Sequence, residues 1–513
     1  MPEHNPTHLQ TSLIQKTIRG MIWAFSGAGA YTALKVATIA ILARLLTPED
    51  FGTVAAAALV IVFGEIFSQM GLGPCLVQLK EVEEDRLRTA LTLSLGLGVL
   101  FGLIVYLAAP LISAFYRMPE VVQVCQVLSL CFPLRSASVV AESLLKRALD
   151  FRKIVTADIA SYGIGYGLGG VVMAWWGFGL WSIVFGIVLQ NALRMLILVS
   201  VQRHPWRLGL SPVALRRLFN VGGGFTLSNL FNVFALYGDN LVVGRWLGPA
   251  MLGLYTRSYN LMAVSVTLFG NVLSSVLFPA MSSLQGNEER LRLAYLRTVS
   301  FASTVMLPCS VVAFVMAPEI ILTLLGPGWE GAVLPFRILC LGMYFRVGYK
   351  VGATLLQATG EVYAYASREG FYAFLVIAGT FFGQRWGLSG VSSAVLLALA
   401  VHFAVLSLSG MKRLGVNFRT FLHLHTQGLL LAIFCGSFAW GASSAFAHIR
   451  LPIPAVLFLT VATLTGSLAV LLLKFPSLTA GKNNLWTIEP LMKIIVPVTP
   501  TLRRMAGLGI KRV

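Results

Sequence analysis

Hydrophobic residues in this chain come in long uninterrupted blocks that short polar segments separate. A helix that crosses the ~30 Å apolar core of a bilayer needs roughly 20 apolar residues. Blocks of that length predict about fourteen membrane-spanning helices, and therefore an all-α polytopic membrane protein. The predicted spans are residues 21–45, 51–78, 90–115, 121–145, 154–176, 178–201, 221–247, 250–283, 298–325, 331–357, 366–386, 388–410, 427–447 and 452–473.

The composition supports this interpretation. Hydrophobic residues make up 57% of the chain and charged residues only 12%, whereas soluble domains carry about 25% charged residues. The mean hydropathy is +0.80, so too few polar side chains are present to cover a water-exposed surface. A soluble enzyme and a disordered scaffold are excluded on this ground.

The net charge of +19 would suit a nucleic-acid-binding protein, but the positions of the basic residues do not. Basic residues gather in alternate segments between the predicted spans, and because such residues remain on the cytoplasmic side of a membrane, both termini are predicted to be cytoplasmic. No nucleic-acid partner is expected. The basic residues predicted on the outer side are Arg44, Arg117, Arg245, Arg385 and Arg450.

Short motifs recur in the same order in two halves of the chain. The motif RxLxPxxFG at residues 44–52 returns as RxLxPxxLG at residues 245–253, and Trp-Gly at 176–177 returns at 386–387. Such repetition indicates an internal duplication. Because both copies begin on the cytoplasmic side, we predict two lobes of about six helices each, related by a parallel repeat. Two C-terminal spans have no counterpart in the first half.

These signals divide the chain into six predicted parts. In the linker, Ser211 is the expected N-cap and Pro212 the first helical residue. The parts are a cytoplasmic N-terminus at 1–20, an N-lobe at 21–205, an interfacial linker helix at 206–220, a C-lobe at 221–412, the two added spans within 413–474, and a basic cytoplasmic tail at 475–513.

Charged side chains within the apolar spans are the candidate functional residues, because a charge in hydrocarbon is costly. Arg346 and Lys350 lie one helical turn apart and can hold one anion together. Carboxylates are candidates for binding a coupling proton or sodium ion, since a low dielectric favours their neutral or cation-bound form. The candidate cations for a substrate cavity are Lys35, Arg257, Arg346, Lys350 and Arg135, and the candidate coupling residues are Glu65, Asp158 and Asp239.

The alternative role for each buried charge is a salt bridge that holds helices together. Arg135 with Glu142 or with Asp158 is the example that the sequence suggests. Asp239, next to Asn240, fits a helix-packing polar cluster as well as a coupling site. Arg194 is set aside because it lies near a helix end, from which its side chain can reach the interface.

No metal site or resident cofactor is expected. The six cysteines form no CxxC pair, and the close histidines His423 and His425 fall in a predicted polar loop without a third ligand. The sequence has no P-loop and no dinucleotide-binding glycine motif. The predicted outer loops are too short for the acid–base machinery of a polymerase or glycosyltransferase.

Several motifs resemble those of one transporter family. They are RLLTPEDFG at 44–52, GLG at 71–73, LVQ at 76–78, Asp239-Asn240 ahead of Gly244, and GLYTR at 253–257. They are similar to polysaccharide repeat-unit flippases, the Wzx-like branch of the multidrug/oligosaccharidyl-lipid/polysaccharide exporter superfamily. The resemblance implies alternating-access transfer of undecaprenyl-pyrophosphate-linked oligosaccharides across the bacterial inner membrane, for exopolysaccharide, capsule or O-antigen assembly.

The buried charges agree with the cargo that the resemblance implies. A pyrophosphate needs fixed cations and a sugar needs polar or aromatic groups. The implied partners are the lipid-linked oligosaccharide, the bilayer, and a polysaccharide polymerase or export machinery. Two alternatives stay open: an ion-coupled multidrug or cation exporter of the same superfamily, which would need an acidic or aromatic cavity, and a membrane polymerase or glycosyltransferase.

Overall fold

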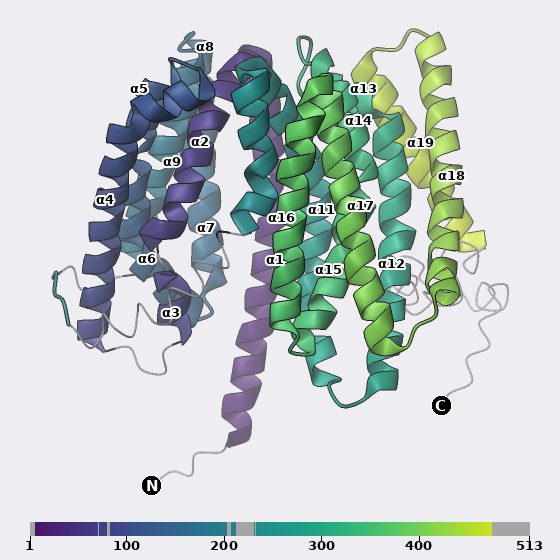
Figure 1. The fold of residues 1–513 in the computed structure, drawn as a ribbon, viewed down its shortest axis with the longest axis horizontal. Coiled ribbons are helices and arrows are strands. Elements are labelled where there is room, and N and C mark those ends of the chain that lie inside the picture. Colours follow the sequence, from purple (N-terminus) through teal and green to yellow (C-terminus); the bar gives the residue numbers. More distant parts are fainter. Residues whose placement is uncertain are drawn as a thin grey trace. The chain divides into compact units, whose positions relative to one another are not determined.

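The computed structural model describes residues 6–69, 71–78, 83–202, 207–211, 230 and 232–474. Every regular element within these ranges is a helix (Figure 1). Ten helices in the described ranges are long and apolar enough to cross a membrane. The prediction of an all-helical, multi-pass membrane protein is confirmed, while the count of about fourteen spans and the two-lobe arrangement stay predictions.

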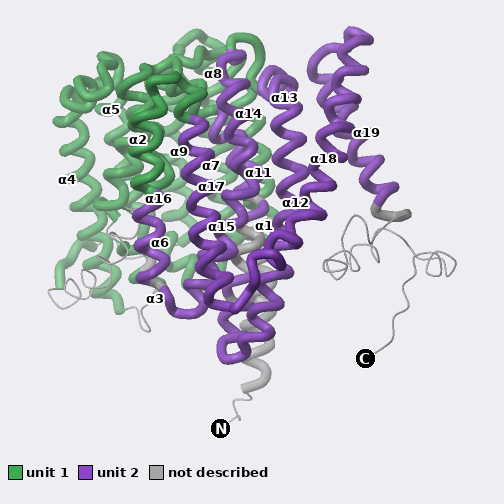
Figure 2. Tube along the Cα trace, turned by 45° about the vertical axis from the view of Figure 1, so that its right-hand side comes forward, with its two compact units in different colours: residues 1–257, 325–328, 373–391 green, residues 258–324, 329–372, 392–513 purple. Residues whose placement is uncertain are grey.

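The chain forms two compact units (Figure 2). Unit 1 comprises residues 1–257, 325–328 and 373–391, and unit 2 comprises residues 258–324, 329–372 and 392–513. The predicted division into lobes, linker and tail stays a prediction. Most of the linker helix and the whole tail at 475–513 lie outside the described residues. Residues 207–211 are not helical, and the amides of Gly209 and Ser211 donate to threonine hydroxyls of α4 (Glu84–Tyr116).

The helices of unit 1 run through the first half of the chain, and a helix over residues 232–247 follows the linker. Parts of α16, α17 and α11 complete the unit. The elements are α1 (Pro6–Leu45), α2 (Pro48–Gln69), α3 (Leu72–Gln78), α4 (Glu84–Tyr116), α5 (Val121–Leu128), α6 (Cys131–Arg147), α7 (Phe151–Ser161), the π-helical η1 (Tyr162–Gly169), α8 (Gly170–Trp175), α9 (Leu180–Val201) and η3 (Gln384–Trp386).

Unit 2 contains most of α11 and the helices that follow it. The α18–α19 pair corresponds to the two predicted C-terminal spans. The elements are α11 (Pro249–Ser283), α12 (Glu288–Val315), α13 (Ala317–Leu324), η2 (Glu330–Ala332), α14 (Val333–Leu341), α15 (Met343–Ala358), α16 (Val362–Gly383), α17 (Gly387–Leu414), α18 (Phe418–His448) and α19 (Ile453–Lys474).

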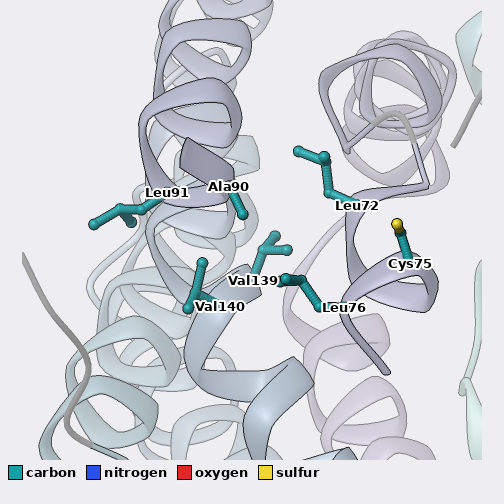
Figure 3. Packing of buried hydrophobic residues seen from close by; sticks show 7 residues of the cluster. All are labelled: Leu72, Cys75, Leu76, Ala90, Leu91, Val139 and Val140. Atoms are coloured by element: carbon teal, nitrogen blue, oxygen red, sulfur yellow. The ribbon is translucent and has the colours of Figure 1, made fainter. Parts of the chain in front are cut away.

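A small apolar core fixes the short helix α3 in unit 1. Leu72, Cys75 and Leu76 share one face of α3, because residues three and four positions apart are neighbours on a helix. This face packs on α4 and α6 (Figure 3). Cys75 behaves there as the buried small hydrophobe that the sequence predicts. Burial was also expected of Cys309, which is exposed. The expectation of burial was therefore wrong for Cys309, which lies on the exposed side of α12.

The two copies of the RxLxPxxG motif lie against each other in unit 1. A Cβ atom on Gly52 would be 2.6 Å from the carbonyl carbon of Pro249, and one on Gly253 would be 2.7 Å from the carbonyl carbon of Pro48. The N-terminal turns of α2 and α11 therefore meet backbone to backbone, and only glycine fits at the crossing. The reciprocal contact is what an internal duplication would produce.

The arginines that begin the two motifs also make contacts in this region. Arg44 lies along Gly326, whose φ of +92° suits glycine. Arg245 places its guanidinium carbon 5.6 Å from the centre of the Phe115 ring. Both arginines thus contact a turn or helix end that is distant in the sequence, so each motif has a packing role in addition to its resemblance to a family signature.

We expect Gly52→Ala and Gly253→Ala to destabilise the protein, because each added methyl group meets rigid backbone. Overpacking of this kind costs about 1–3 kcal/mol. Thermal unfolding in detergent, followed by size-exclusion chromatography, would measure the change. Gly96→Ala is the matched control, since a Cβ at Gly96 in α4 meets nothing within 4 Å. Equal melting temperatures for Gly52→Ala and Gly96→Ala would contradict the expectation.

Candidate functional site

The predicted site residues fall into distinct environments. Some carboxylates and Arg135 belong to ion pairs in unit 1, and Asp239 belongs to a hydrogen-bonded pair. The remaining cations form two arginine–lysine sets, Arg257 with Lys35 in unit 1 and Arg346 with Lys350 in unit 2, and each arginine lies over an aromatic ring.

Arg135 on α6 joins three helices of unit 1. Its Nη1 forms an ion pair with Glu65 on α2, and its Nε donates to Oδ1 of Asn191 on α9 at 2.7 Å. Glu65 is 15% exposed in its side chain. The suggested pairing of Arg135 with Glu142 or Asp158 was wrong. Packing of α2 against α6 places the carboxylate of Glu65, and not one of those two, next to the guanidinium group.

Arg194 on α9 binds the two carboxylates that were suggested for Arg135. Its Nη1 lies 3.0 Å from Oε2 of Glu142, and its Nε lies 2.7 Å from Oδ1 of Asp158. Glu142 also pairs with Lys146 at 2.7 Å. Setting Arg194 aside as an interfacial residue was an error. Its position one turn after Asn191, on the face that meets α6, was the available signal.

Asp239 forms a buried pair with a tyrosine. It is 2% exposed, and the hydroxyl of Tyr255 donates to its Oδ2 at 2.6 Å. Tyr255 is fully buried. The pair connects the helix over 232–247 to α11. This geometry is that of the helix-packing cluster, the second of the two roles that the sequence left open for Asp239.

Arg257 and Lys35 share an aromatic environment in unit 1. The guanidinium carbon of Arg257 lies 4.4 Å from the centre of the Phe51 ring, a cation–π contact. Its Nε is buried and forms no hydrogen bond with any described residue. Lys35 is exposed and close enough to repel Arg257 electrostatically. No carboxylate of the described ranges forms an ion pair with either cation.

A widened helical segment places two tyrosines beside Arg257. Tyr162 and Tyr166 lie on η1, their ring centres are 5.2 Å apart, and both interact electrostatically with the guanidinium. The segment is rich in glycine, and a Cβ on Gly165 would lie 2.6 Å from Cα of Gln190 on α9. This close approach accompanies the π-helical turn, a distortion that often occurs at functional sites.

Arg346 and Lys350 lie together in unit 2. Arg346 is 6% exposed, its guanidinium carbon lies 4.8 Å from the centre of the Tyr259 ring, and its Nη1 makes no hydrogen bond within the described structure. Lys350 repels Arg346 electrostatically and lies along Gly270, where a Cβ would be 2.8 Å from Nζ. Neither cation has an ion-pair partner among the residues placed by the structure.

The histidine pair at 423 and 425 is helical, so the predicted polar loop was wrong. Both residues belong to α18, which begins earlier than the hydropathy pattern suggested. Nδ1 of His425 donates to the carbonyl oxygen of Phe421 at 2.8 Å, and Nε2 accepts a hydrogen bond from the Tyr344 hydroxyl. His425 thus connects α18 to α15. Within the described residues, no group of three side chains could hold a metal ion.

The charges therefore separate into two classes. The carboxylates chosen from the sequence have partners, namely Arg135 for Glu65, Arg194 for Asp158 and Tyr255 for Asp239. The other four predicted cations, two of which lie over aromatic rings, have no carboxylate partner within the described ranges. Such an arrangement attracts anions and offers ring faces to sugars.

We expect Arg194→Gln to lower the free energy of unfolding by about 2–3 kcal/mol, because it leaves the carboxylate of Asp158 unpaired. The cost is below that of full burial, since Asp158 is 35% exposed in its side chain. Thermal unfolding in detergent would measure it. Asp158→Asn in the same chain should restore most of the loss, and a double variant no more stable than Arg194→Gln would contradict the assignment. The control is Arg413→Gln, which removes an exposed ion pair.

Comparison with known proteins identifies the family. The family of polysaccharide biosynthesis proteins matches residues 41–334. The lipopolysaccharide biosynthesis protein WzxC of Escherichia coli (strain K12) is 25% identical over 417 residues, which cover 80% of this chain and 84% of WzxC. The succinoglycan biosynthesis transport protein ExoT of Rhizobium meliloti (strain 1021) is 26% identical over 468 residues, which cover 81% of this chain and 94% of ExoT.

Solved structures show the fold. The lipid II flippase MurJ, in an inward closed conformation, matches 88% of this chain and 98% of its own with a TM-score of 0.68 at 14% identity. An inward-facing multidrug resistance MATE family transporter of the MOP superfamily matches 75% of this chain and 94% of its own with a TM-score of 0.61 at 18% identity. The chain therefore belongs to the polysaccharide biosynthesis protein family, and its fold is that of the lipid II flippase MurJ and of the MATE family transporter.

Proposed function

We propose that the protein moves undecaprenyl-pyrophosphate-linked oligosaccharide repeat units from the inner to the outer leaflet of the bacterial inner membrane. The material then enters exopolysaccharide, capsule or O-antigen assembly. One observation carries the proposal: the two arginines, Arg257 and Arg346, lie over a phenylalanine and a tyrosine ring, each with a lysine as its charged neighbour. None of these four cations has a carboxylate partner among the described residues.

The chemistry of each cation pair suits a pyrophosphate. Each pair combines an arginine, which can contact phosphate oxygens in a bidentate manner, with a lysine, which attracts them as a point charge. Charge-assisted hydrogen bonds of this kind contribute about 1.5–3 kcal/mol each. The rings of Tyr162 and Tyr166 in unit 1, and of Tyr259 in unit 2, can pack on sugar faces.

Alternating access between two lobes is the mechanism that we propose. The repeated motifs support it, because parallel repeats generate two bundles that can move about a central site. The reciprocal packing of Gly52 and Gly253 supports it further, since it joins corresponding positions of the two copies through contacts that need no side chain. A polysaccharide polymerase or export complex is the partner that would receive the product.

A multidrug exporter is the competing function, because a multidrug transporter shares the fold. A cationic drug would need carboxylates that it can approach. Of the carboxylates selected from the sequence, Glu65 and Asp158 are bound to arginines and Asp239 to Tyr255. The cations selected with them, Lys35, Arg257, Arg346 and Lys350, have no carboxylate partner in the described ranges. The charge distribution therefore favours an anionic cargo.

Both termini are proposed to lie in the cytoplasm, following the distribution of basic residues. A C-terminal green fluorescent protein fusion should fluoresce, because that protein folds there and fails to mature when exported unfolded. An alkaline phosphatase fusion after Arg117 should be active, since this residue lies on the predicted outer side. A dark C-terminal fusion together with an inactive Arg117 fusion would reverse the orientation.

We expect a deletion strain to accumulate an undecaprenyl-linked repeat unit that a periplasmically added glycosidase cannot reach. Lipid extraction and mass spectrometry would identify the cargo. Arg346→Gln and Lys350→Gln should each lower the flipping rate about 10–100-fold, which corresponds to one lost charge-assisted phosphate contact. Arg337→Gln is the matched control, because Arg337 contacts Phe314 and its carbonyl oxygen rather than either cation pair.

Unchanged levels and accessibility of the lipid-linked sugar in the deletion strain, with no redundant flippase present, would reject this function. The multidrug exporter would then become the better explanation. Equal activity of Arg346→Gln, Lys350→Gln and the Arg337→Gln control would be compatible with the flippase function. It would show that Arg346 and Lys350 of unit 2 do not bind the substrate.

A further inference from the structure

His402 on α17 occupies an unusual site in unit 2. Its side chain is fully buried, and its ring is enclosed by two tyrosines. The ring centre lies 4.5 Å from that of Tyr372 in a stacked arrangement and 4.7 Å from that of Tyr349 in an edge-to-face arrangement. Neither ring nitrogen forms a hydrogen bond with a described residue. Buried polar groups are nearly always hydrogen-bonded, so each exception calls for an explanation.

Close helix packing holds His402 in this site. A Cβ on Gly348 of α15 would lie 2.6 Å from Cε2 of Phe403, and one on Gly352 would lie 3.0 Å from the carbonyl oxygen of Leu406. The GxxxG spacing therefore lets α17 approach the backbone of α15, as in other membrane helix pairs. This approach places His402 beside Tyr349, which lies one helical turn from Arg346 on α15.

Glu369 on α16 is the carboxylate nearest to His402. Its Oε1 lies 3.4 Å from Nε2 of His402, and its side chain is 14% exposed. Among the described residues, no lysine or arginine forms an ion pair with it. Glu369 therefore differs from Glu65 and Asp158, whose carboxylates are bound to arginines. Adding a proton to Glu65 or Asp158 would break an ion pair, whereas adding one to His402 would create an ion pair with Glu369.

We infer that His402 and Glu369 form a proton-binding site whose protonation strengthens anion binding at Arg346 and Lys350. A proton that binds Nε2 of neutral His402 yields an imidazolium that donates to Oε1 of Glu369. The pair changes from a net charge of −1 to neutral. In the deprotonated state the carboxylate acts on Tyr349, which also interacts with Arg346, and so offsets part of the positive potential at that end of the anion site. Protonation removes that offset. No bond between heavy atoms forms or breaks.

The other charged and titratable groups beside the pair do not supply this pH-dependent change in charge. On α15 the charged neighbours are Arg346, whose guanidinium group stays charged at any pH near neutral, and Lys350 beside it. The phenols of Tyr349, Tyr365 and Tyr372 surround the pair, and that of Tyr259 lies beside Arg346. A phenol ordinarily loses its proton only near pH 10. Histidine is the side chain that ordinarily changes charge between about pH 5 and 8. Proton and anion binding are thus linked, and the linkage is reciprocal.

This inference rests on the proposed function only through the anion site, so the test has two independent arms. The first uses the full-length protein with ¹⁵N-labelled histidine in lipid bilayers, studied by solid-state NMR between about pH 5.5 and about pH 8.5. The chain has 7 histidines. The signal lost in His402→Gln should change from the neutral to the protonated form, and the change should shift to lower pH in Glu369→Gln. A His402 signal that keeps one form throughout would overturn the inference.

The second arm measures binding of farnesyl pyrophosphate, a soluble prenyl pyrophosphate, to the purified protein. Its affinity should rise about tenfold more between high and low pH in the wild type than in His402→Gln or Glu369→Gln. Ionisation of the ligand itself affects all variants equally and cancels in this ratio. His425→Gln is the matched control, because both nitrogens of His425 already have partners. The same pH dependence in every variant would overturn the linkage.

Failure of the proposed function gives a different pattern. In that case the wild type would not bind farnesyl pyrophosphate at any pH, while the NMR signal of His402 would still decide whether the proton site exists. Because Glu369→Gln keeps the size of its side chain and leaves the ring of His402 in place, it tests the pair even if His402→Gln folds poorly.

Discussion

A charge inside an apolar helix bundle must be neutralised or enclosed by groups that interact with it, because hydrocarbon provides no solvation. This constraint organises the described part of the protein. Arg135 joins α6 to α2 and α9, and Arg194 joins α9 to α6 and α7. These ion pairs hold the helices of unit 1 together, and each of the two arginines pairs with a carboxylate that looked functional in the sequence.

The remaining cations satisfy the same constraint in another way. Arg257 and Arg346 place their guanidinium groups over aromatic rings, which attract a cation without neutralising it. A net positive charge therefore persists in both units. An anionic ligand would complete these sites, and membership of a polysaccharide biosynthesis family makes a lipid-linked pyrophosphate the natural candidate. The His402–Glu369 pair adds a proton-dependent charge to the same neighbourhood.

Glycine sets the distances at which these side chains meet. Gly52 and Gly253 let the two motif copies touch through their backbones, Gly165 lets η1 lie on α9, and Gly348 with Gly352 brings α17 against α15. In each case a Cβ atom would collide with backbone or a ring. The helix crossings, and with them the positions of Tyr162, Arg257 and His402, depend on the absence of side chains as much as on their presence.

The helical membrane class and the family could be read from the sequence, and an internal repeat could be predicted from it, because hydrophobic block length and linear motifs are local properties of the chain. The sequence also singled out Lys35, Arg257, Arg346 and Lys350, since a basic residue in an apolar block is visible without a structure. The sequence could not determine which side chains pair with one another. Arg135 pairs with Glu65 rather than with Glu142. Arg194 binds two carboxylates instead of reaching the interface, and His402 lies beside Glu369. Only the tertiary structure decided these pairings, because they depend on which faces of distant helices pack together and on how closely the glycines let them approach.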